Sequence, residues 1–92
     1  MARPGPSDEG AGPGPARELD CRGLYCPLPV LRTERALSGL APGEVLRVVA
    51  TDPVSEIDMA VFSQRSGHPL VRRERRGEEL IFYFRKSAGD GA

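Results

Sequence analysis

The chain of 92 residues carries 13 basic and 13 acidic side chains, and 39% of its residues are hydrophobic. This length allows one domain with a small core, which leaves little room for a pocket that encloses a large cofactor. The balanced charge does not favour direct nucleic-acid binding. The sequence also lacks a secretory signal and any run of about 18 apolar residues. We therefore expect a cytoplasmic protein that has its chemistry at the surface and no contact with membranes.

The two ends of the chain differ in composition from its middle. Residues 1–16 are rich in proline and glycine and carry no large apolar side chain after Met1. Such a segment cannot bury enough surface to offset the entropy of ordering it, so we predict a disordered leader over 1–16. Residues 87–92 are similar and are predicted to form a flexible tail. The folded domain is then expected over residues 17–86.

The first half of this domain has the pattern of a strand, a helix and a second strand. Apolar and charged residues alternate over 17–21, which predicts a strand. Pro27 and Pro29 then mark the start of a helix over 30–40, since proline is tolerated in the first turn. The β-branched run over 44–50 predicts a second strand that is buried on both faces or nearly so. Together these segments indicate a parallel β-α-β unit.

A second helix is predicted after Asp52. An aspartate followed by proline is typical of a helix start, so we expect a helix over 53–65 with Asp52 as its N-cap. Its apolar residues Val54, Ile57 and Val61 recur at helical spacing and are expected to face the core. A contact between Asp52 and a partner protein is the less favoured interpretation.

The last segments predict a terminal hairpin. Residues 68–74 form a weaker strand pattern, 75–78 a connection, and 79–86 a final strand in which apolar residues alternate. The order β-α-β-α-β-β predicts an α+β fold, a two-layer α/β sandwich with a mixed four-stranded sheet and two helices on one face.

The chemistry of the chain is expected at Cys26, which directly precedes the predicted helix start. Unpaired amide groups and the helix dipole favour a thiolate there, so we predict a lowered pKa for Cys26, with Arg22 as a further stabilising charge. Pro27 and Pro29 stiffen the segment that would present the sulfur. The alternative is that Cys26 is a small buried hydrophobic residue, as free cysteines often are.

The remaining candidates receive structural interpretations. Cys21 shares its strand face with Leu19 and is predicted to lie in the core, with a resolving thiol as the alternative. Two cysteines and His68 are too few for a structural zinc site, so no metal site is predicted. The basic cluster could contact RNA phosphates, but the glutamates among its arginines favour a solvated hairpin tip. This cluster consists of Arg72, Arg73, Arg75 and Arg76.

The segment Leu-Asp-Cys-Arg-Gly-Leu-Tyr-Cys-Pro-Leu-Pro at 19–29 resembles the Cys-Pro-x-Pro motif of the TusA/SirA-like sulfurtransferase family. Pro-Gly-Glu at 42–44 and Ala-Thr-Asp-Pro at 50–53 also match the family pattern, and the resemblance extends over 18–86. Smaller matches are Ser-Gly-His at 66–68 and Phe-Arg-Lys at 84–86.

This resemblance implies a function that composition cannot show. Cys26 would accept sulfane sulfur as a persulfide from a cysteine desulfurase or a rhodanese-type enzyme. It would pass the sulfur to a sulfur-relay acceptor protein of tRNA thiolation, sulfur oxidation or molybdenum cofactor synthesis. No metal or organic cofactor is implied for the transfer, and a free carrier of this kind is expected to be a monomer. Two other hypotheses remain: a regulatory or RNA-binding module, and a thiol switch between Cys21 and Cys26.

Overall fold

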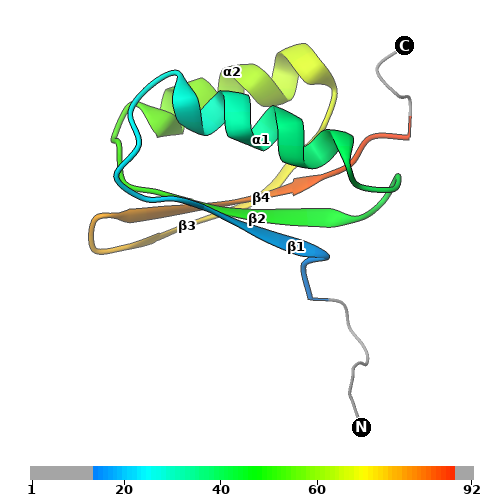
Figure 1. Ribbon diagram of the computed structural model, residues 1–92, viewed down its shortest axis with the longest axis horizontal. Coiled ribbons are helices and arrows are strands. Elements are labelled where there is room, and N and C mark those ends of the chain that lie inside the picture. The colour runs from blue at the N-terminus through cyan, green and yellow to red at the C-terminus, as the bar shows by residue number, and fades with distance from the viewer. Residues whose placement is uncertain (1–13, 89–92) are drawn as a thin grey trace, which may run out of the picture.

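The computed structural model describes residues 14–88, in which a four-stranded sheet is covered on one face by two helices (Figure 1). This confirms the predicted α+β sandwich and its element order. The predicted leader over 1–16 and tail over 87–92 lie mostly outside the described residues. The elements are β1 (Arg17–Cys21), α1 (Leu28–Ser38), β2 (Val45–Ala50), α2 (Ser55–Ser66), β3 (Leu70–Arg76) and β4 (Glu79–Arg85).

The sheet is mixed, with the strand order β1-β2-β4-β3. β1 and β2 are parallel, with Leu19 opposite Val48, whereas β2 and β4 are antiparallel, with Val48 opposite Phe82. β3 and β4 form the predicted hairpin, which turns at Gly77 with a φ of 61°. A positive φ of this kind suits glycine, which has no Cβ to clash with the backbone.

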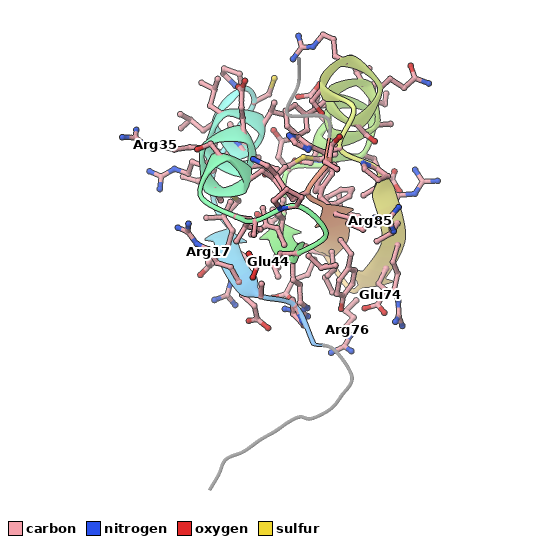
Figure 2. The ribbon with its side chains drawn as sticks, turned by 90° about the vertical axis from the view of Figure 1, so that its right-hand side faces the viewer. Arg17, Arg35, Glu44, Glu74, Arg76 and Arg85 are labelled. Carbon is pink, nitrogen blue, oxygen red and sulfur yellow. The ribbon has the colours of Figure 1, made fainter. Side chains whose placement is uncertain are left out.

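The core lies between the sheet and the helices. Alternate residues of β2 and β4 point toward the helices and are buried, while the other face of the sheet carries no helix, although Ile81 of β4 is buried on that face. In Figure 2, the charged side chains of Arg35 on α1 and Arg76 on β3 point away from this core. The buried apolar residues are Cys21, Ala36, Leu37, Leu46, Val48, Ala50, Met59, Phe62, Leu80, Ile81, Phe82 and Phe84.

The face of α2 that packs on the sheet differs from the predicted one. Val54, Ile57 and Val61 were expected in the core, but all three are exposed, and the exposed fraction of Ile57 is 70%. Met59 and Phe62 are buried instead. Both sets of residues have helical spacing, so periodicity alone could not decide between the two faces. An exposed apolar stripe on α2 is the result.

A buried hydroxyl on α1 allows a test of the packing. Thr33 is fully buried, and its Oγ1 has no hydrogen-bond partner among the described residues. A buried polar group without a partner is destabilising, so Thr33→Val should raise the free energy of unfolding by about 1 kcal/mol. Urea unfolding measures this change, and Thr33→Ser, which keeps the hydroxyl and loses the methyl group, should be less stable than the native chain. A Thr33→Val variant of lower stability would contradict this interpretation.

Candidate functional site

The candidate site lies at the edge of the sheet where β1 and β2 end. Because these neighbouring strands are parallel, their carboxyl ends meet at one edge, and the chain enters each helix from there (Figure 1). The loop after β1 carries Cys26, and the segment after β2 carries Asp52. Two segments that are distant in the sequence are thus brought together by the strand order.

Hydrogen bonds hold the Cys26 loop against the segment after β2. The amide of Gly23 donates to Oγ1 of Thr51 at 2.9 Å, and the amide of Cys26 donates to Oδ2 of Asp52, also at 2.9 Å. The other carboxylate oxygen of Asp52 accepts from the amide of Val54 at 3.1 Å. Through these two hydrogen bonds, the carboxylate of Asp52 links the backbone at Cys26 to the segment before α2. Asp52 itself is only 8% exposed.

This role of Asp52 differs from the predicted N-cap. α2 begins at Ser55, two residues later than predicted, and its N-cap position is Val54, without a capping side chain. The backbone carbonyl of Asp52 accepts from the amide of Ser55 at 2.9 Å. The residue therefore organises the turn before the helix, and its side chain also reaches the neighbouring loop.

The two cysteines lie in opposite environments. Cys26 is exposed, directly before a helix whose N-cap is Pro27 and whose first turn contains Pro29; this helix begins at Leu28 and ends at Ser38, two residues earlier at each end than the predicted 30–40. Cys21 is fully buried, as predicted from its strand position. Both thiols are free. The interpretation of Cys26 as a buried hydrophobic residue is therefore wrong.

The predicted lowering of the Cys26 pKa is also wrong. The pKa of this thiol is raised, first by its hydrogen bond to the Asp58 carboxylate, then by partial removal from solvent and by the charges of Asp58 and Asp52. The start of α1 offers few amide donors that could stabilise the thiolate and counter this rise in pKa. Pro27 and Pro29 have no amide hydrogen, and the Leu28 amide donates to the carbonyl of Tyr25. Nearby negative charge favours the neutral thiol.

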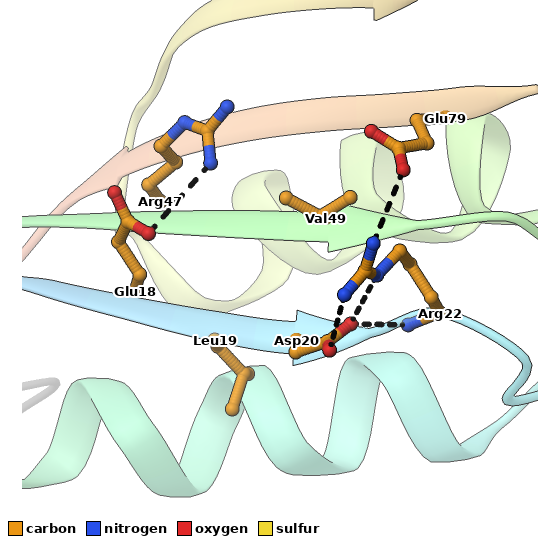
Figure 3. Close-up of a pocket in the computed structure, with 7 residues that line it drawn as sticks. All are labelled: Glu18, Leu19, Asp20, Arg22, Arg47, Val49 and Glu79. Atoms are coloured by element: carbon orange, nitrogen blue, oxygen red, sulfur yellow. Dashed lines mark hydrogen bonds and ion pairs between the residues drawn. The ribbon is translucent and has the colours of Figure 1, made fainter. Parts of the chain in front are cut away.

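Arg22 does not lie where it could stabilise a thiolate. Its guanidinium forms hydrogen bonds to Asp20, at 2.9 Å and 3.0 Å, and to Glu79 at 3.4 Å, on the open face of the sheet (Figure 3). The hydrogen bonds from Arg22 lower the pKa of Asp20 to about 2. Within the described part of the chain, Arg22 is not one of the charged groups that shift the pKa of Cys26. Its predicted tuning role is therefore not supported.

Asp58 is the site residue that sequence reasoning missed. It lies on α2, whereas the thiol lies in the loop before α1, so their contact depends on how the two helices sit on the sheet. The spacing of motifs in the sequence does not reveal how the two helices are placed on the sheet. The one available signal was its position one turn into a helix that starts beside the Cys26 loop.

The arginines of β3 are partly neutralised by carboxylates. Arg72 forms an ion pair with Glu74, and Arg75 lies 3.9 Å from Glu56 of α2. Arg72 also stacks over the ring of Tyr83, 5.5 Å from its centroid. These contacts agree with the interpretation of the cluster as solvated side chains near the hairpin tip and not with a free basic patch for RNA.

His68 follows Gly67 at the end of α2, the opposite end of that helix from Asp58. Its Nδ1 accepts a hydrogen bond from the amide of Ser87 at 2.9 Å. Over residues 14–88, no group of three or more histidine, cysteine or carboxylate side chains is arranged to hold a metal ion. Neither of the two helices described has the length and apolar character that crossing a membrane would require.

The exposure of the two thiols predicts selective labelling. Iodoacetamide should modify Cys26 alone in the native protein and both cysteines after unfolding, because the reagent cannot reach Cys21. Since carboxylates raise the pKa of Cys26, its labelling rate should still be rising with pH above neutrality. Mass spectrometry of the labelled chain measures both effects. Native labelling of Cys21, or a rate that has reached its plateau at neutral pH, would contradict the geometry.

Comparison with known proteins gives sequence matches over most of the chain. A family model described as sulfurtransferase TusA matches residues 17–86. The sulfur carrier protein TusA of Allochromatium vinosum is 41% identical over 71 residues, covering 77% of this chain and 93% of that protein. A putative sulfur carrier protein, YrkI, of Bacillus subtilis is 38% identical over 68 residues, covering 74% of this chain and 91% of that protein.

The fold has a solved counterpart. The crystal structure of a SirA-like protein from Desulfitobacterium hafniense superposes with a TM-score of 0.68 and 22% identity, covering 77% of this chain and 97% of that one. This likeness supports the two-layer architecture described above. The family match over residues 17–86 and the relative at 41% identity show that the chain belongs to the TusA family of sulfurtransferases.

Proposed function

We propose that this protein is a sulfur carrier, which accepts sulfane sulfur as a persulfide on Cys26 and passes it to an acceptor protein. The observation that carries the proposal is the exposed Cys26 thiol, whose backbone is fixed by Asp52 at the sheet edge. Curated relatives in the same family are named sulfur carrier proteins. Because the other thiol, Cys21, is buried, Cys26 is the cysteine that a partner enzyme can reach.

The proposed reaction needs only thiol chemistry. Cys26, as the thiolate, attacks the terminal sulfur of a persulfide on the donor enzyme. A new S–S bond forms on Cys26, the donor S–S bond breaks, and the donor sulfur leaves as a thiolate that takes up a proton. Transfer to an acceptor cysteine repeats the same exchange with Cys26 as the leaving group. No separate oxidant or reductant is consumed.

The partners follow from this chemistry as part of the proposal. A cysteine desulfurase or a rhodanese-type enzyme would supply the sulfur in the cytoplasm. A relay protein of tRNA thiolation, sulfur oxidation or molybdenum cofactor synthesis would receive it. The thiol of Cys26 is exposed, which suits a monomeric carrier that inserts Cys26 into the active sites of other proteins.

Loading with sulfur tests the proposal. The native chain, incubated with a cysteine desulfurase and cysteine, should gain the mass of one sulfur atom, and peptide mapping should place it on Cys26. Cys26→Ser should gain none, whereas Cys21→Ala, if it remains folded, should load normally. A native chain that takes up no sulfur from several donors of both enzyme classes would overturn the proposed function.

The two alternative functions have less support. An RNA-binding role would rest on the β3 arginines, of which Arg72 and Arg75 face carboxylates. A disulfide switch would need Cys21, which is sealed in the core and free in this structure. Neither has an observation of its own comparable to the exposed Cys26.

A further inference from the structure

A groove lies between β1 and α1, apart from the thiol of Cys26, and has a volume of about 380 Å³. Its lining residues are Arg17, Leu19, Arg32, Arg35, Ala36 and Ser38. Half of this lining is arginine, and none of it is a carboxylate. In Figure 2, Arg17 of β1 and Arg35 of α1 lie on the same side of the molecule. The groove therefore gathers positive charge on a chain whose total charge is balanced.

The groove arginines are not used by the fold. Over residues 14–88, four other arginines form ion pairs with carboxylates, whereas the three in the groove form none. The neighbouring carboxylates act elsewhere: Glu18 lies 3.9 Å from an arginine of β2, and the charge of Glu34 acts on His68 beyond the end of α2. Because Arg32 and Arg35 are three residues apart on α1, their charges also repel each other. A ligand of opposite charge would relieve this repulsion.

The groove follows the edge of the sheet. In the order β1-β2-β4-β3, no described strand pairs with the outer side of β1, so the backbone on that side can accept an added strand. Leu19 points toward α1, whereas Glu18 and Asp20 belong to the open face of the sheet (Figure 3). An extended segment that pairs with β1 therefore places every second side chain over the groove. Pairing of two copies through β1 would bring two arginine grooves together, which disfavours a second copy of this chain as the occupant.

The charges around β1 indicate what kind of molecule fits. Guanidinium groups bind planar anions, so the candidates are carboxylates of a protein and phosphates of a nucleic acid. A phosphate chain is negative along its whole length, and beyond the groove it would meet the exposed carboxylates of Glu18 and Asp20. An extended protein segment alternates its side chains, so it can present carboxylates to the groove and neutral or basic groups to these two residues. An acidic protein strand is therefore favoured.

Helix α1 connects this groove with the sulfur site. The helix begins at Leu28, two residues after Cys26, and Arg32 and Arg35 follow four and seven residues later. At a rise of 1.5 Å per residue, they lie about 6 Å and about 10 Å along the helix from its start. An enzyme whose active site receives Cys26 can therefore reach the groove. Because the groove is already formed while both thiols are free, it suits the partner that meets the unloaded carrier, which is the sulfur donor.

Building on the proposed function, we propose that the groove between β1 and α1 binds an acidic extended segment of the sulfur donor. The segment pairs with the edge of β1 and places its carboxylates against Arg17, Arg32 and Arg35. It holds the donor while Cys26 attacks the donor persulfide, and it takes no part in the chemistry itself. Because guanidinium–carboxylate pairs need a defined geometry, they also fix the register of the added strand. The groove thus decides which donors the carrier accepts.

Binding is measured first on the free protein, with a short capped peptide in which glutamate and threonine alternate. In an NMR titration at low salt, the shifted amides should be those of β1 and α1. Arg32→Gln/Arg35→Gln should weaken this binding roughly tenfold. The matched control is Arg73→Gln/Arg76→Gln, which removes the same charge from β3 at the opposite edge of the sheet and should bind as the native chain does. Equal weakening in both double variants, shifts outside the groove, or tighter binding of a short oligouridylate there would overturn the proposed occupant.

Docking is measured next in the loading reaction. With a donor enzyme that loads the native chain, Arg32→Gln/Arg35→Gln should raise the carrier concentration for half-maximal loading roughly tenfold and leave the maximal rate unchanged, because the groove does not touch the reacting sulfur. The β3 control should load normally. An unchanged half-maximal concentration would overturn the docking role and leave the arginines as charges that protect an edge strand from pairing. If no donor loads the native chain, the sulfur-carrier function fails together with donor docking, while the peptide titration still decides what the groove binds.

Discussion

Replacing Phe84 by alanine should destabilise the domain by about 3–5 kcal/mol, because its ring is fully buried between the sheet and α2. The ring meets that of Phe62 edge-on, with centroids 5.6 Å apart, and so links the two layers. A folded unit of this size has a total stability of about 4–10 kcal/mol. The variant should therefore be partly or largely unfolded at room temperature, as circular dichroism and urea titration would show.

A control on the same sandwich sharpens this prediction. Ile57→Ala truncates a residue that the sequence placed in the core and the structure places at the surface, so its effect on stability should stay within about 0.5 kcal/mol. If Ile57→Ala proved as disruptive as Phe84→Ala, the observed orientation of α2 would be wrong.

Removing the carboxylate of Asp52 should affect both stability and sulfur transfer. Asp52→Ala leaves the amides of Cys26 and Val54 without their acceptor, at a cost of about 1–3 kcal/mol. Because the Cys26 loop loses its anchor, sulfur loading should fall by about tenfold or more, as misplaced reacting groups do. Urea unfolding and the initial rate of loading from a cysteine desulfurase measure the two effects.

Two further variants separate this anchor from simple loss of charge. Asp52→Asn keeps one acceptor oxygen and should lie between the native chain and Asp52→Ala in both measurements. Asp20→Asn removes an exposed carboxylate that pairs with Arg22, and should change stability by less than about 1 kcal/mol and leave loading unchanged. Native stability and loading in Asp52→Ala would show that the anchor is unimportant.

Most of the fold could be predicted because local patterns agree with the final packing. The β-branched run of β2, the alternation along β4 and the proline-led start of α1 each predict one element type, although β2 alternates between buried and half-buried residues and is not buried on both faces as predicted. α2 was the exception, since two apolar stripes compete on it. The stripe with the larger side chains, Met59 and Phe62, packs against the sheet. Val54, Ile57 and Val61 are therefore exposed to solvent.

The site was only half predictable for a different reason. The position of Cys26 before a helix follows from its two prolines, which act locally. Its electrostatics depend on Asp58, which lies on the other helix, and lack the predicted charge of Arg22, which is paired with Asp20 and with the distant Glu79. The prolines that mark the helix start also remove amide donors from it. A rule based on helix termini alone therefore gave the wrong direction for the pKa of Cys26.

The central claim is that Cys26 holds a transferable sulfane sulfur. The most direct measurement is cyanolysis of the native chain after loading by a cysteine desulfurase, followed by intact mass analysis. We predict one equivalent of thiocyanate per loaded chain, with the mass returning to that of the free protein and the Cys26 thiol regenerated. A loaded sulfur that resists cyanide, or one that maps to Cys21, would contradict the account.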